Sequence, residues 1–150
     1  MFLTAIVASL ALAASDTAKG DVPTVLEAHF LAIDAQGEVV ETTSIPHRPG
    51  ASCYSWVLLV EPENRTLSVR ELFELPDSAE TWNSDPSAVT VVNRDRSGAV
   101  TEFEESLGDG VITHSWCVAE GDPVGPHRIR VFVGDRLLHD FRFSVVAESY

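Results

Sequence analysis

The chain has 150 residues, of which 45% are hydrophobic and 22% are charged, a balance typical of one globular domain with a sizeable core. Its 23 acidic residues outnumber its 10 basic ones, which gives a formal net charge of −13. Because a phosphate-binding protein needs a positive face, this charge argues against nucleic acid and anionic membrane surfaces as partners.

The first 14 residues carry no charged side chain and are typical of a secretory signal peptide. Their apolar run is too short to span a bilayer as a stable helix, and Ala11-Leu12-Ala13 is a small-x-small cleavage pattern. We expect cleavage after Ala13 or Ala14, a periplasmic or secreted protein, and no stable membrane insertion afterwards. A buried first strand or helix is the alternative for this segment. Residues 15–24, which are mostly small and polar, are expected to form a flexible lead-in.

From residue 25 onward, short apolar runs alternate with turn residues, which predicts an all-β domain over residues 25–148. About seven to nine strands of this kind make an antiparallel, immunoglobulin-like β-sandwich. The strands expected before the final hairpin are Glu27–Asp34, Val39–Ile45, Cys53–Val60, Thr66–Leu75, Val89–Asn93, Ala99–Glu105 and Val111–Ala119.

The run Thr66–Leu75 is ambiguous, because its apolar residues follow neither a helical nor a strand period. We predict a strand with a bulge, with a helical turn around Arg70–Phe73 as the alternative. Residues Pro76–Ser87 hold two Pro, two Asp and three Ser around Trp82, and so predict a long loop.

The clearest pattern is the last one along the chain. Ile129–Val133 and Arg136–Val146 alternate polar and apolar residues on both sides of Gly134-Asp135. A two-residue connection that begins with Gly is typical of a β-hairpin, because Gly adopts the positive φ needed at the first turn position.

Cys53 and Cys117 are the only cysteines, and in an exported chain they are expected to be bonded. If their strands pair antiparallel with Cys53 opposite Cys117, Tyr54 lies by Trp116, Ser55 by Ser115, Trp56 by His114 and Leu58 by Ile112. This register places the disulfide on the less apolar face and the aromatic and aliphatic side chains in the core. The alternatives are a bridge between the two sheets, as in antibody domains, and a pair of free thiols.

Five histidines raise the question of a metal site, with His114, Cys117 and His127 as candidate ligands. The spacing does not match a blue-copper site, and His114 is expected instead to pack against an aromatic side chain. The sequence holds no Gly-x-Ser-x-Gly motif, no phosphate-binding Gly loop and no dinucleotide fingerprint. We therefore expect no catalytic residue, no metal and no cofactor.

Trp82 is the best candidate for a binding residue, because it stands in a polar loop, whereas Trp56 and Trp116 lie in apolar strands. Exposed aromatic side chains around Trp82 would form a glycan-binding platform.

The C-terminal pattern resembles the terminal hairpin of many uncharacterised bacterial exported proteins with immunoglobulin-like sandwiches. It comprises Trp116, the turn Gly121–Pro126 and the run Ile129–Val145. The run Leu67–Pro76 with Trp82 is similar to the same group. The resemblance implies a binding, adhesion or scaffold module, and its motif residues are structural, so it implies no catalytic residue.

Three functions follow from these patterns. The first is a non-catalytic module that binds another protein at the cell envelope, which predicts an exposed apolar patch or an unprotected edge strand. The second is a glycan-binding module, which requires Trp82 and a second aromatic side chain to be coplanar and exposed. The third is a small hydrolase or metalloenzyme, which requires His114 or His127 to meet carboxylates in a cleft.

Overall fold

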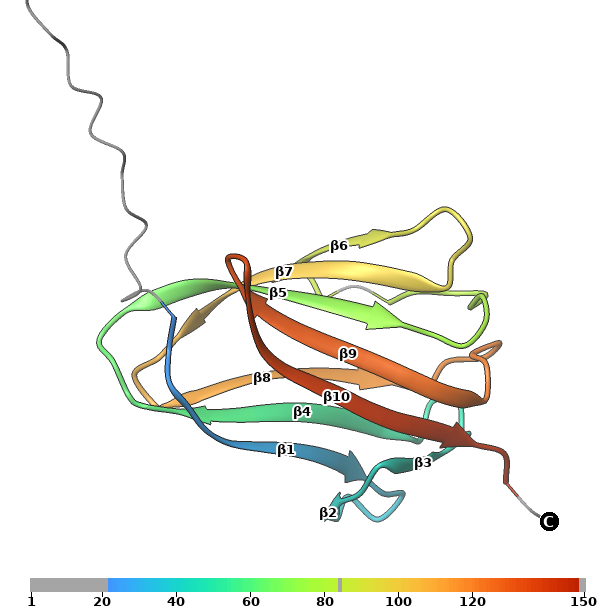
Figure 1. Cartoon of the computed structure of the whole chain (residues 1–150). Helices are drawn as coiled ribbons and strands as arrows, with labels where there is room; N and C mark the ends of the chain where they lie inside the picture. The colour runs from blue at the N-terminus through green and yellow to red at the C-terminus, as the bar shows by residue number, and fades with distance from the viewer. Residues whose placement is uncertain (1–21, 84, 149–150) are drawn as a thin grey trace, which may run out of the picture.

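The computed structural model describes residues 22–83 and 85–148 (Figure 1). This part of the chain forms ten strands and no helix. The strands are β1 (Val25–Ile33), β2 (Val39–Glu41), β3 (Ser44–Pro46), β4 (Cys53–Val60), β5 (Thr66–Glu74), β6 (Val89–Val92), β7 (Gly98–Ser106), β8 (Val111–Cys117), β9 (Gly125–Val133) and β10 (Arg136–Val146).

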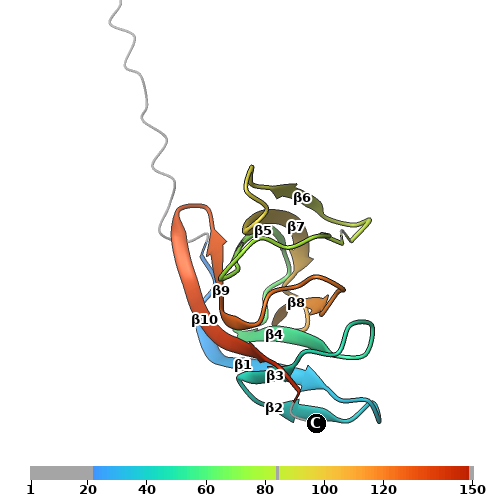
Figure 2. The same cartoon turned by 90° about the vertical axis from the view of Figure 1, so that its right-hand side faces the viewer.

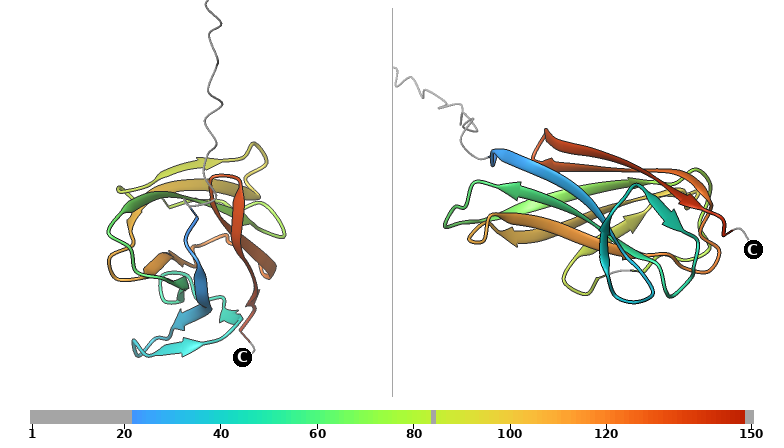
Figure 3. Two further views of the ribbon diagram at one scale, coloured as in Figure 1. Left: turned by 60° about the vertical axis from the view of Figure 1, so that its left-hand side comes forward. Right: turned by 90° about the horizontal axis from the view of Figure 1, so that it is seen from below.

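The strands form two sheets that pack face to face. One sheet has the order β2-β1-β4-β8 and the other β3-β10-β9-β5-β7-β6. Neighbours are antiparallel except β10 and β3, which are parallel. The larger sheet curls from β6 round to β3 (Figure 2), and the described chain begins and ends at opposite ends of the sandwich (Figure 3). The all-β immunoglobulin-like sandwich predicted from the sequence is confirmed.

The single strand expected over Val39–Ile45 is wrong, because the chain changes sheets within it. Thr42 still donates its backbone N–H to Phe30 beside β2, but its Oγ1 accepts a bond from the backbone N–H of Ser44 at 3.1 Å. This local bond turns the chain, and Ser44–Pro46 then pairs with β10 in the other sheet. The division raises the strand count to ten, above the seven to nine expected.

The register predicted between β4 and β8 is confirmed over its whole length, from Cys53 opposite Cys117 to Leu58 opposite Ile112. Cys53 and Cys117 form a disulfide between these neighbouring strands of one sheet. The alternatives of a bridge between sheets and of free thiols are therefore wrong. Tyr54, Trp56 and Leu58 point into the core.

Strand β5 is regular, so the predicted bulge is wrong, and so is the alternative of a helical turn around Arg70–Phe73. Its pairing with β7 continues without a shift from Thr66 opposite Ser106 to Glu74 opposite Gly98. Leu67, Val69, Glu71 and Phe73 all face inward, and the acidic residue in this row is what interrupts the apolar period.

The final hairpin is confirmed, with Gly134 at φ +55° in the turn between β9 and β10. The inward face of the hairpin packs in the core through Ile129, Val131, Phe141 and Phe143.

The segment predicted as a signal peptide, residues 1–14, lies outside the described residues, as does most of the lead-in. Among the residues that are described, no helix is long and apolar enough to cross a membrane.

Candidate functional site

A carboxylate lies in the centre of the core. Glu71 on β5 has no exposed surface. It accepts hydrogen bonds from the indole N–H of Trp56 on β4 and, at 2.8 Å, from that of Trp116 on β8. His114 on β8 donates from Nδ1 to Oε2 of Glu71 at 3.1 Å. Because a buried carboxylate without partners is costly, these three donors from the facing sheet stabilise it and join the two sheets.

A glutamate beside a histidine can serve in acid–base chemistry, but this pair is enclosed. The ring of His114 stacks on Phe103 at a centroid distance of 5.1 Å, which confirms the aromatic neighbour expected from the sequence. The carboxylate of Glu71 is closed off by the indoles that bond it. The carboxylate therefore has no open position for a reacting atom, and the cluster joins the two sheets.

The other histidine considered as a ligand lies elsewhere. His127 donates from Nδ1 to the carbonyl of Gly125 at 2.9 Å, and its ring lies against Phe73 and Phe143. Cys117 is bonded to Cys53, so it offers no thiolate. Within residues 22–83 and 85–148, no three His, Cys, Asp or Glu side chains are grouped to hold a metal ion.

Trp82, the candidate binding residue, is partly buried against the core. Its indole N–H donates to the carbonyl of Arg96 at 3.1 Å. Its ring meets Trp116 at 5.9 Å with an interplanar angle of 85°, and meets Phe73 in the same perpendicular way. Trp82 and Trp116 do not form the coplanar pair that a glycan platform requires, but both line a narrow pocket.

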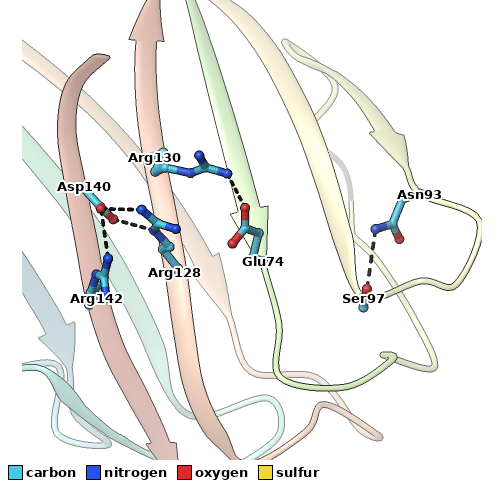
Figure 4. Close-up of polar contacts among 7 residues, drawn as sticks. All are labelled: Glu74, Asn93, Ser97, Arg128, Arg130, Asp140 and Arg142. Atoms are coloured by element: carbon cyan, nitrogen blue, oxygen red, sulfur yellow. Dashed lines mark hydrogen bonds and ion pairs between the residues drawn. The ribbon is translucent and has the colours of Figure 1, made fainter.

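The outer face of the larger sheet carries a row of charges across β10, β9 and β5 (Figure 4). Asp140 accepts two bonds from Arg128, at 2.9 and 2.7 Å, and a longer one of 3.5 Å from Arg142. Arg128 beside it lowers the pKa of Asp140. Arg130 pairs with Glu74 in the same row. Arg142 on β10 and Arg128 on β9 are directly opposite each other, so their positive charges repel. The carboxylate of Asp140, which bonds both, offsets this repulsion.

At the other end of this sheet, the edge strand β6 exposes apolar side chains. Val89 and Val91 are 67% and 65% exposed. Val91 lies opposite Val100 on β7, which in turn lies opposite Leu72 on β5. These three side chains line an open hollow of about 290 Å³.

The backbone of β6 is unpaired on its outer side. The backbone N–H of Asn93 donates to the carbonyl of Gly98 at 2.9 Å across the β6–β7 turn. Because the backbone groups of successive residues point to opposite sides of an antiparallel strand, the N–H and C=O of Val91 point toward β7. Those of Thr90 and Val92 point away from β7, to the open side of the strand. Within the described ranges, β6 pairs with β7 alone and no backbone group bonds its outer side. This open edge is a template for another strand.

Sequence reasoning missed two of these features. Glu71 could have been found by continuing the alternation of Leu67 and Val69 through to Phe73, which places residue 71 inward. The openness of β6 could not have been found, because edge position depends on the order of strands in the sheet.

Comparisons with known proteins agree with the fold. The sequence model of the PM0630 beta sandwich domain matches residues 27–146. An immunoglobulin-like protein from Pseudomonas aeruginosa, known from a crystal structure, superposes with a TM-score of 0.51 at 19% identity, over 80% of this chain and 92% of that one. Among curated proteins, none matches the sequence.

Proposed function

This chain belongs to the PM0630 beta sandwich domain family. From this family and from the open edge of β6, we propose that the protein is a non-catalytic module that binds another protein by strand addition. The observation that carries this proposal is the combination, on one edge, of outward backbone groups at Thr90 and Val92 with exposed apolar side chains at Val89 and Val91.

Two of the other sheet edges, β8 and β2, favour docking less. Strand β8 turns Thr113, Ser115 and Cys117 outward, so its outer face is polar and holds the disulfide. Strand β2 exposes Val39 and Val40 but is only three residues long. Strand β6 is four residues long and borders the hollow of Leu72, Val91 and Val100, which gives an incoming strand an apolar surface to cover.

The occupant that fits this edge is an extended, basic segment of another protein. Glu102 and Glu104 project from β7 on the outer face beside β6, and Val89 lies directly opposite Glu102. A second copy of this chain would bring the same formal charge of −13 to the interface. Alternating cationic and apolar side chains would pair with the carboxylates and cover the valines.

The compartment we propose for this binding is the periplasm or the outside of the cell. Support comes from the Cys53–Cys117 disulfide, which persists in oxidising compartments, and from the leader-like pattern of residues 1–14. The intact mass of the exported protein tests the leader directly. A mass that begins at Ala14 or Ser15 is expected, and an exported protein that retains Met1 would overturn the predicted cleavage.

Binding is tested with a peptide of about eight residues that alternates Lys and Val, the length of an ordinary strand. Val92→Pro removes one outward N–H while leaving the bonds of β6 to β7, so it should weaken binding about tenfold or more. Val39→Pro is the matched control, because β2 is an exposed edge of the other sheet and Val39 likewise faces its N–H outward.

The proposal is overturned if the Lys–Val peptide does not bind the wild-type protein, or if it binds the Val92→Pro variant as well as the wild type. An alternating Glu–Val peptide that binds equally well would overturn the basic character of the partner. Circular dichroism verifies that both proline variants keep the fold.

A further inference from the structure

A narrow pocket lies at the end of the sandwich, between the loop that follows β5 and the loop that follows β8. Its volume is about 20 Å³, which is room for one group the size of a water molecule. Trp82 and Asn83 line it from the first loop and Asp122 from the second, while Tyr54 and Trp116 reach it from β4 and β8.

The aromatic walls of this pocket are held in place by hydrogen bonds. Trp116 donates to Glu71 at 2.8 Å, and Trp82 donates to the carbonyl of Arg96 at 3.1 Å. Phe73 packs against both indoles, with centroid distances of 5.3 Å to Trp116 and 5.7 Å to Trp82. The ring faces are therefore fixed before any ligand enters.

Asp122 brings a partly buried carboxylate to the pocket without a cationic partner. Its Oδ2 accepts from the backbone N–H of Ala119 at 2.7 Å, and burial raises its pKa. Among the described residues, Asp122 makes no ion pair and its Oδ1 has no hydrogen-bond donor. The nearby His47 bonds the backbone carbonyl of Asp122 at 2.8 Å instead of its carboxylate.

Tyr54 adds a second unused polar group. The residue is only 4% exposed, yet its hydroxyl has no hydrogen-bond partner in the part of the chain that is described. Burial raises the pKa of Tyr54 well above its usual range, and the nearby charges of Asp122 and Glu71 raise it further. The hydroxyl of Tyr54 and the partly buried carboxylate of Asp122 line the same pocket with no bond between them, which leaves a gap for one group that bonds both.

The charges around the pocket favour a cation in that gap. The side chain of Glu80 lies against Gly121, next to Asp122, and forms no ion pair with another described residue. The guanidinium of Arg96 is already bonded to the carbonyls of Ala79 and Glu80. A neutral occupant such as water would satisfy the hydroxyl but leave the partly buried carboxylate of Asp122 without an opposite charge.

We propose that this pocket binds a primary ammonium group, either of a small amine or of a lysine side chain on another protein. The ammonium donates to Oδ1 of Asp122 and to the hydroxyl oxygen of Tyr54, and it lies against the faces of Trp82 and Trp116, whose π-systems attract cations. The site is separate from the β6 edge, so the test of ammonium binding is independent of the test of strand addition.

The test titrates the full-length protein with n-butylammonium and with its neutral analogue 1-butanol. The readouts are tryptophan fluorescence and the NMR shifts of the indole N–H groups of Trp82 and Trp116. The ammonium is expected to bind about tenfold or more tightly than the alcohol, the difference that a charged hydrogen bond makes.

Variants locate the site. Asp122→Asn keeps an oxygen for the N–H of Ala119 but loses the charge, and should lower ammonium affinity about tenfold. Tyr54→Phe should lower it less. Asp135→Asn, in the exposed β9–β10 turn, is the matched control and should leave affinity unchanged.

Nα-acetyl-lysine-N-methylamide distinguishes the two sources of the ammonium. Tighter binding than n-butylammonium assigns the pocket to a lysine side chain, and weaker binding assigns it to a free amine. Equal affinity for 1-butanol, unchanged affinity in Asp122→Asn, or indole shifts that no amine alters up to its solubility limit would overturn the proposal and leave a pocket that holds water only.

Discussion

Trp116 donates its indole N–H to Oε1 of Glu71 at 2.8 Å, which ties the edge strand of the smaller sheet to the middle of the larger one. Trp56 and His114 complete the set of donors around the same carboxylate. Much of the contact between sheets is apolar, and this network adds three polar contacts between them.

Replacing Glu71 should therefore be severe. Glu71→Ala leaves two indoles and one imidazole without an acceptor and opens a cavity, so the free energy of unfolding should fall by about 3–5 kcal/mol. Glu71→Gln keeps one oxygen but points an amide N–H₂ at a donor, and should cost about 1–3 kcal/mol. Urea unfolding followed by circular dichroism measures both. Glu102→Gln, on the outer face, is the control and should change stability by no more than about 0.5 kcal/mol.

The disulfide should be a major source of stability. It joins residues separated by 64 positions, and closing a loop of that length in the unfolded chain is worth about 4 kcal/mol in the chain-entropy treatment. The double variant Cys53→Ala/Cys117→Ala should lose a comparable amount, and thiol reductant should lower the Tm of the wild type but not of the variant. If the Tm of the wild-type protein is the same with and without reductant, this account is contradicted.

Two neighbouring glycines should respond differently to substitution. Gly110 has φ +68°, and a Cβ there would lie 2.7 Å from the backbone carbonyl oxygen of Val60. Gly110→Ala should cost about 1–2 kcal/mol or more from the left-handed backbone alone. Gly108→Ala meets no atom nearer than 3.5 Å, at a backbone conformation open to alanine, and should be neutral or slightly stabilising. Paired thermal unfolding measures the contrast, and equal losses would contradict it.

His127 should make stability fall in mild acid. Burial lowers its pKa below the ordinary value of 6.5, an effect partly opposed by the bond to the carbonyl of Gly125. As pH falls through about 6.5, the unfolded chain takes up a proton that the folded protein does not, so unfolding becomes more favourable until the folded pKa is reached. His127→Phe keeps the ring but not the titration, and should lose less stability than the wild type between about pH 7.5 and 5.5. Parallel slopes would rule out this role for His127.

The local parts of the fold could be predicted from the sequence. Alternation in the last two strands, with Gly134 in the turn, identified the hairpin, and the pairing of Cys53 with Cys117 set the register of a whole strand pair. Both depend on the two-residue period of a strand, in which one pairing fixes all the others.

The remaining features depend on tertiary structure. Glu71 interrupts an apolar row, so the period of β5 was misread, although its partners Trp56, His114 and Trp116 lie on strands that the sequence did identify. The change of sheet at Thr42 and the pocket around Asp122 both depend on segments distant in sequence. Trp82 lies in the loop predicted from the sequence, but its perpendicular contact with Trp116 has no sequence signal.

Site-resolved amide exchange, with and without the Lys–Val peptide, tests strand addition at β6 most directly. We predict that the peptide slows exchange at the outward amides of Thr90 and Val92, while Val91, already bonded to β7, changes little. Peptide binding that leaves Thr90 and Val92 exchanging as fast as before, or that protects β2 instead, would contradict the account.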